Sequence, residues 1–142
     1  MSKPRWILVL ALLGACASTD TPNDGGPADR SPIPDGQGRL ILYRKSAMKS
    51  GAIRPSVMLN GKAIGQSVPG TYFVVDREPG DYTVNCSVAT DHSISFSLKE
   101  GQTIYIEQRA TMGIYVGHIK PGIVSESTGK AAVSKCTRAG GG

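Results

Sequence analysis

The sequence predicts an all-β protein, a single β-sandwich of the immunoglobulin-like or prealbumin-like kind. Three observations lead to this fold class. Short apolar runs are separated by turn residues at intervals of about 8 to 12 positions, as in sandwiches. No window of about 11 residues has convincing helical periodicity. Several runs alternate apolar and polar residues, which is typical of strands with one buried face. The length of 142 residues leaves room for one domain.

The first predicted strand covers residues 39–44, which are apolar on both faces. That pattern is typical of a central strand covered on both sides. Residues 56–59 and 62–65 form the next two strands, and Asn60-Gly61 lies between them. Asn-Gly is the strongest short hairpin signal, because a type I′ turn needs positive φ at both central positions. We therefore expect a hairpin here.

Further strands are expected at residues 71–76, 82–88 and 93–99 and around Ile104 and Ile106. The strand at 82–88 alternates strictly, so that Cys86 lies on the inward face. Residues 114–119 and 122–125 are candidates for short strands. Residues 128–135 fit either a strand or a single helical turn. The β-sandwich domain as a whole is assigned to residues 39–138, with a disordered tail at 139–142.

Residues 1–15 have the composition of a secretory signal peptide. Lys3 and Arg5 precede the apolar residues 6–13, which are followed by small residues. This run is far shorter than the roughly 20 residues of a permanent membrane helix. The junction Leu13-Gly14-Ala15-Cys16 resembles the bacterial lipobox, which implies cleavage before Cys16 and attachment of lipid to its thiol. The alternative is an ordinary signal peptide cleaved at the small-x-small sequence Ala15-Cys16-Ala17, which leaves the position of the cysteine unexplained.

Residues 16–38 are interpreted as the lipidated cysteine and a flexible linker, because Ile33 is their one large aliphatic residue. In lipoproteins of this type, Asp after the cysteine is associated with inner-membrane retention. Ala17 occupies that position here, so we expect the periplasmic leaflet of the outer membrane. The membrane, through the lipid on Cys16, is thus one expected partner.

The positive charge of the predicted domain favours anionic surfaces, such as phospholipid or polyanionic envelope polymers. From Arg39 onward there are 13 Lys and Arg against 7 Asp and Glu. These charges are scattered singly, which is also typical of a solvated basic surface. An envelope protein or polymer is a possible partner. We expect no nucleic-acid partner.

Cys86 and Cys136 are an even pair in an oxidising compartment if Cys16 carries lipid, and this predicts a disulfide between them. The alternative is an unpaired buried cysteine at position 86. No metal site or cofactor is expected, because neither His92 nor His118 stands at a ligand spacing from the cysteines or from the other histidine.

The sequence contains no recognised catalytic motif, so we expect no catalytic residues and no enzyme. Asp91-His92-Ser93 is interpreted as a polar turn between strands, and His118 beside Lys120-Pro121-Gly122 likewise. The five tyrosines include candidates for a sugar-stacking platform, but most fit core positions at strand spacing.

Several turn and core motifs occur together in a characteristic order, and they resemble a family of small bacterial lipoproteins classified as a domain of unknown function. The motifs are Leu42-Tyr43-Arg44, Leu59-Asn60-Gly61-Lys62, Gly70-Thr71-Tyr72-Phe73, Pro79-Gly80-Asp81-Tyr82, Gly101-Gln102-Thr103-Ile104-Tyr105 and Lys135-Cys136. The resemblance covers residues 38–138. The Pro-Gly-x-Tyr turn and the strand after it are also similar to β-sandwich modules of the PEGA and carboxypeptidase-regulatory type.

This resemblance implies a β-sandwich in the cell envelope, supplies no catalytic residues to carry over and is silent on activity. We therefore expect a membrane-tethered periplasmic lipoprotein that acts as a non-enzymatic binding or scaffolding module for an envelope partner. A carbohydrate-binding or envelope-polymer-binding module is the alternative. A hydrolase with an unrecognised site comes third.

Overall fold

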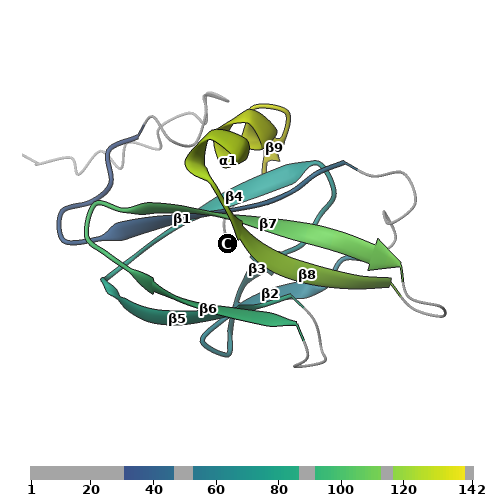
Figure 1. The fold of residues 1–142 in the computed structure, drawn as a ribbon, viewed down its shortest axis with the longest axis horizontal. Helices are drawn as coiled ribbons and strands as arrows, with labels where there is room; N and C mark the ends of the chain where they lie inside the picture. Colours follow the sequence, from purple (N-terminus) through teal and green to yellow (C-terminus); the bar gives the residue numbers. More distant parts are fainter. Residues whose placement is uncertain (1–30, 47–52, 87–91, 113–116, 140–142) are drawn as a thin grey trace, which may run out of the picture.

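Two β-sheets pack face to face, and a helix covers the outer side of one of them (Figure 1). The computed structural model describes residues 31–46, 53–86, 92–112 and 117–139. The five-stranded sheet has the order β8-β7-β1-β4-β9, and the four-stranded sheet has the order β3-β2-β5-β6. The elements are β1 (Gly38–Arg44), β2 (Ser56–Leu59), β3 (Lys62–Gln66), β4 (Thr71–Arg77), β5 (Gly80–Asn85), β6 (Ser93–Leu98), β7 (Thr103–Met112), β8 (Gly117–Val124), α1 (Glu126–Val133) and β9 (Thr137–Arg138). The prediction of an all-β sandwich is confirmed.

Strand β1 is the centre of the fold, because its two faces enter two different apolar clusters. Leu40 and Leu42 belong to the core between the sheets, which we call the inter-sheet core. Ile41 and Tyr43 point the other way, as alternate strand residues do. They join the helix-side cluster, whose buried members are Ile41, Tyr43, Tyr72, Tyr105, Ala132 and Val133. The predicted central strand covered on both sides is therefore confirmed.

The β2–β3 hairpin forms at Asn60-Gly61 as predicted. Asn60 has φ +48° and Gly61 has φ +78°, the left-handed values that a type I′ turn requires. Strand β1 pairs antiparallel with β4 and parallel with β7. The parallel pair joins segments about 60 residues apart in the chain, a distance that local patterns do not report.

The chain after β7 resolves the alternatives that the sequence left open. Strand β8 runs without a break from Gly117 to Val124, through the region expected to contain a turn. Pro121 is tolerated there because β8 is an edge strand and can lack a ladder donor. Residues 126–133 are an α-helix, capped by the Ser125 side chain, which accepts a hydrogen bond from the Thr128 N–H.

The last residues of the predicted linker contact the domain. The Arg39 guanidinium donates to the Ser31 carbonyl at 2.6 Å and to the Pro32 carbonyl at 3.3 Å. The same side chain forms a bidentate pair with Asp76 on the neighbouring strand, at 2.8 and 2.9 Å. Arg39 thus fixes the start of the described chain against β1 and β4.

Candidate functional site

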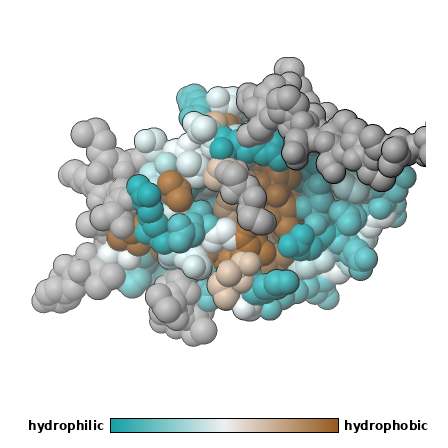
Figure 2. All heavy atoms as spheres, turned by 180° about the vertical axis from the view of Figure 1, so that it is seen from behind, coloured by the Kyte–Doolittle hydropathy of each residue, from teal (hydrophilic) through white to brown (hydrophobic). Residues whose placement is uncertain are grey.

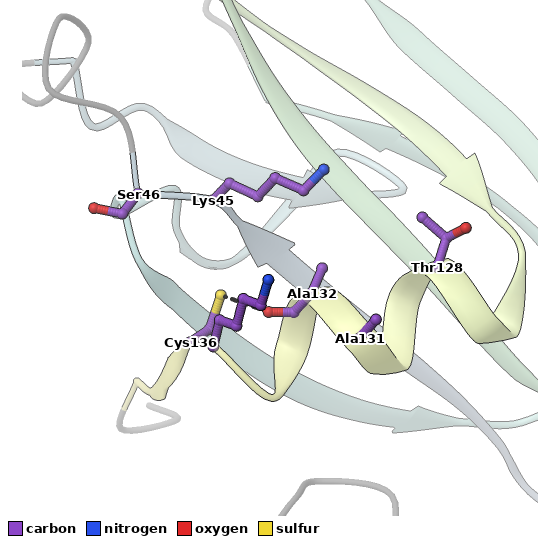
Figure 3. A pocket seen from close by; sticks show the side chains of 7 residues that line it. Lys45, Ser46, Thr128, Ala131, Ala132 and Cys136 are labelled. Atoms are coloured by element: carbon purple, nitrogen blue, oxygen red, sulfur yellow. Dashed lines mark hydrogen bonds between the residues drawn. The ribbon is translucent and has the colours of Figure 1, made fainter.

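A pocket of about 560 Å³ lies beside α1, on the outer side of the five-stranded sheet. We call it the α1 pocket. Figure 3 shows that its walls come from two parts of the chain, the end of β1 and the helix with the segment after it. The lining residues are Lys45 and Ser46, then Thr128, Ala131 and Ala132, then Lys135 and Cys136. Its volume lies in the range typical of small-molecule sites, about 300 to 1,000 Å³.

The helix is placed by close packing rather than by its own stability, since eight residues are too few for an isolated helix. Gly129 lies against the Tyr105 ring, where a Cβ atom would be only 2.2 Å from the Tyr105 Cγ. One turn later, Ala132 and Val133 enter the helix-side cluster. This contact sets the distance between α1 and the sheet, and so the width of the pocket.

A charged group adjoins the pocket on the sheet side. Glu107 on β7 is buried, and its carboxylate contacts the Lys45 ammonium and the Arg109 guanidinium at 3.0 Å each. Burial by itself would raise the pKa of Glu107, but the hydrogen bonds and charges of Lys45 and Arg109 outweigh it and lower that pKa. Glu107 is therefore ionised at neutral pH, and it holds Lys45 at the rim.

Tyr43 lies beneath the helix with its side chain fully buried. Its hydroxyl has no hydrogen-bond partner in the described part of the chain. Burial, followed by the nearby Glu107 charge, raises the pKa of Tyr43 to about 12. A buried hydroxyl without a partner costs free energy, which makes this position a point of local instability beside the pocket.

Cys136 forms part of the wall and is a poor nucleophile. Its thiol lies 3.4 Å from the Ala132 carbonyl oxygen, to which it donates (Figure 3). It also donates to the Arg44 carbonyl, at 3.7 Å from Sγ. Burial raises the pKa of Cys136, so the thiolate is scarce at neutral pH. The Lys45 ammonium is paired with the Glu107 carboxylate. These groups can bind a ligand, but they do not form an activated catalytic set.

The structure does not contain the predicted disulfide, since Cys86 and Cys136 are both free thiols. Cys86 belongs to the inter-sheet core, whereas Cys136 packs against the helix-side cluster. The five-stranded sheet lies between the two clusters, and a disulfide needs Cα atoms within about 7 Å. The alternative of an unpaired buried cysteine at position 86 is the correct one. Burial raises the pKa of Cys86 to about 12.

The other predicted site residues fall in different places. Cys16 lies outside the described residues, so its lipidation stays a prediction. The spacing of His92 and His118 along the chain gave no reason to expect contact between them. Their rings nevertheless meet edge to face, with ring centroids 5.6 Å apart. His118 lies in β8, so the predicted turn at this position is wrong. Among the described residues, no three His, Cys, Asp or Glu side chains come together to hold a metal ion.

A second cavity of about 490 Å³ opens between β3 and β4. Ile64, Phe73 and Val75 supply apolar side chains to it, and Lys62 and Arg77 are among its other lining residues. Figure 2 views the molecule from behind, the side on which β3 and β4 lie, and shows apolar atoms gathered in the middle of that face. We call this cavity the β3–β4 cleft.

The sequence did not indicate that Lys45, Lys135 and Glu107 belong to one site. They come from the segment just after β1, the segment after α1 and the middle of β7. No local motif connects these positions. A usable signal was present only at Glu107, a charged residue that directly follows the apolar run Ile104-Tyr105-Ile106.

The fold and the α1 pocket define a small β-sandwich domain with a ligand-sized pocket on its outer face. Residues 34–119 match the model of the family described as "Protein of unknown function (DUF2846)", and the chain belongs to that family. It is 27% identical over 135 residues to a Haemophilus influenzae protein described as uncharacterized, covering 92% of this chain and 80% of the relative. No solved structure matches the chain. Within the described residues, no helix is long and apolar enough to span a membrane.

Proposed function

We propose that this protein is a lipid-anchored lipoprotein of the bacterial cell envelope. The observation that carries this part is the sequence Leu13-Gly14-Ala15-Cys16, directly after the apolar run 6–13. An acyl chain contributes about 0.8 kcal/mol of membrane binding for each buried methylene, so two or three chains anchor a protein stably. With Ala17 after the cysteine, the periplasmic leaflet of the outer membrane is the proposed location.

The domain is proposed to act there as a non-enzymatic binding or scaffolding module for an envelope partner. The character of the α1 pocket supports this role. Its groups can make contacts with a ligand, whereas its thiol has a raised pKa and Lys45 is engaged by Glu107.

The described tyrosines give little support to the alternative of a carbohydrate-binding module. Tyr43, Tyr72 and Tyr105 are buried in the helix-side cluster. Tyr82 packs against the inter-sheet core and stacks on Phe96 at 6.3 Å. Sugar-stacking platforms need exposed aromatic faces, which Tyr43, Tyr72 and Tyr105 do not offer and which Tyr82, half-buried against Phe96, offers only in part. A hydrolase remains the third candidate, because no described group in the α1 pocket is set up as a nucleophile with a base.

The experiment that tests the anchor is metabolic labelling with a radioactive fatty acid in cells that express the wild-type chain or Cys16→Ala. We expect label in the wild type and none in the variant, which should accumulate as unprocessed precursor or soluble protein. Cys86→Ala is the matched control, because it removes a different thiol and should keep the label. Labelled Cys16→Ala protein would show that the proposed anchor is wrong.

The scaffolding role is tested separately by cross-linking the tethered protein in living cells and identifying what is attached. Recovery of a defined envelope protein would support the proposal that the domain is a binding module. Recovery of no protein would count against this part of the proposal and leave the anchor unaffected.

A further inference from the structure

The α1 pocket combines an apolar floor with cationic groups. Ala131 and Ala132 contribute only methyl groups, and the Cys136 thiol is already bonded to backbone carbonyls. A fully polar ligand would lose its hydrogen bonds to water against such a floor. The floor therefore suits an apolar group.

The rim of the pocket carries positive charge that the protein does not neutralise. Lys45 and Lys135 both line it. The adjoining carboxylate, Glu107, is shared between Lys45 and Arg109. Lys135 is exposed and has no ion-pair partner in the described part of the chain. Its ammonium is free to bind an anion, and such charge-assisted hydrogen bonds are the stronger ones.

Hydroxyl groups complete the polar side. Thr128 Oγ1 accepts a hydrogen bond from Ser125 Oγ at 2.8 Å, so its own hydrogen can be donated elsewhere. Ser46 lines the opposite end of the pocket, just after β1, and its hydroxyl points away from α1 (Figure 3). A hydroxyl donor suits the oxygens of a carboxylate or a phosphate.

We propose that the α1 pocket binds a single-chain amphiphile with an anionic head, a carboxylate or a phosphate monoester, and a short aliphatic tail. The head lies at Lys135, and the tail lies on Ala131 and Ala132. This inference deepens the proposed binding function and rests on it. It is independent of lipidation at Cys16.

The test uses the full-length chain with Cys16→Ala, purified without detergent so that no other amphiphile competes. Binding of decanoate, decyl phosphate and decanol is measured by calorimetry, each below its micelle-forming concentration. We expect both anions to bind and decanol to bind at least about tenfold more weakly, since it lacks the charge. The tighter anion identifies the head group.

Two substitutions locate the site. Lys135→Gln should weaken both anions about tenfold, whereas Lys99→Gln, at an exposed lysine in the β6–β7 turn, should change nothing. Ala131→Leu fills the pocket at an exposed helix position and should abolish binding. Ala63→Leu adds the same bulk in the β3–β4 cleft and should leave binding intact.

Three results would overturn the proposal. Equal binding of decanol and decanoate would show that the pocket does not recognise an anionic head. Loss of binding in Ala63→Leu rather than Ala131→Leu would move the site to the β3–β4 cleft. Failure of all three probes to bind would refute the ligand class. None of these results concerns acylation of Cys16, so failure of this inference and failure of the proposed anchor are distinguishable.

Discussion

At the scale of single residues, Tyr43 is a polar group that the fold buries without satisfying it. Its hydroxyl is fully buried and has no partner in the described part of the chain. We predict that Tyr43→Phe raises the free energy of unfolding by about 1 kcal/mol, because it removes an unsatisfied hydroxyl and keeps the ring. Urea denaturation followed by circular dichroism measures this change.

Tyr82→Phe is the control for that prediction. The Tyr82 hydroxyl donates to the Glu78 carbonyl at 2.6 Å, so its removal should lower stability by about 0.5 to 1.5 kcal/mol. The two variants delete the same atom in opposite environments and should differ in sign. A loss of stability in Tyr43→Phe would mean that its hydroxyl is satisfied after all.

Glu107 is the residue whose charge makes the stability of this region depend on pH. Its pKa is lowered in the folded protein, because Lys45 and Arg109 outweigh the opposing effect of burial. A lowered pKa adds stability above the unfolded value, about 4.3 for Glu, and this stability is lost as the pH falls through the folded value. Protonation of Glu107 thus releases Lys45 from the rim.

We predict that Glu107→Gln lowers the free energy of unfolding by about 1 to 2 kcal/mol at pH 7. The difference from the wild type should shrink as the pH falls below the unfolded value of about 4.3, and it should vanish once Glu107 is protonated in the folded protein as well. Urea unfolding across this range measures it. Glu126→Gln breaks the exposed Glu126–Lys130 pair and should cost less than about 0.5 kcal/mol. A difference for Glu107→Gln that stays constant with pH would contradict the assignment.

At the scale of elements, the position of α1 depends on a contact between a glycine and an aromatic ring. Adding a methyl group at Gly129 places it 2.2 Å from the Tyr105 Cγ, a distance that forces the helix away from the sheet. This conflict is stronger than the helix preference of alanine over glycine, which is about 1 kcal/mol. The absence of a side chain at position 129 is therefore what lets α1 lie flat.

We predict that Gly129→Ala lowers the free energy of unfolding by about 1 to 3 kcal/mol, as overpacked core positions do. Gly122→Ala is the matched control, since a Cβ there meets nothing within 4 Å, and it should be neutral or slightly stabilising. Chemical denaturation of both variants gives the comparison. Greater stability in Gly129→Ala would show that α1 is not held against Tyr105.

At the scale of the whole molecule, Arg44 ties the two layers of the sandwich together. It is 1% exposed, although it ends a strand of the five-stranded sheet. Its guanidinium donates to the Ile53 carbonyl at 2.6 Å and the Ser67 carbonyl at 3.0 Å, and these residues flank the β2–β3 hairpin of the other sheet. Burial is the main cause that lowers the pKa of Arg44.

We predict that Arg44→Met lowers the free energy of unfolding by about 2 to 5 kcal/mol, because two interior carbonyls lose a charged donor. Arg77→Met is the control. Arg77 is exposed and donates to the backbone carbonyl of the preceding residue, so its effect should stay within about 0.5 kcal/mol. Equal effects of the two substitutions, measured by urea unfolding, would refute the role of Arg44 as a link between the layers.

Much of the fold was predictable because strands and tight turns have characteristic patterns over a few consecutive residues. Alternation identified the inward faces of β5 and β6, and the double-sided apolar pattern identified β1 as central. The positive φ at Asn60 and Gly61 follows from the chemistry of those two residues. The segment at 128–135 was ambiguous because a helix this short has too few positions to establish a period.

The candidate site was not predictable in the same way. The prediction of a disulfide between Cys86 and Cys136 was wrong. An even number of cysteines does not indicate which face of a sheet each one occupies, and these two lie on opposite faces. The burial of Arg44 and the meeting of His92 with His118 likewise depend on pairings between distant segments. The alternation of apolar and polar residues in a strand shows which face of that strand is buried. It does not show which other strands or helices lie next to it.

The sequence by itself determined the positions of β1 to β7, the β2–β3 turn and the sandwich class, because each depends on residues close together in the chain. Tertiary structure alone decided that β1 lies between β4 and β7, that α1 rests on Tyr105 through Gly129, and that Lys45 and Lys135 share a pocket. The physical reason is that the closing of loops and the packing of layers select among many pairings that local patterns leave equally possible.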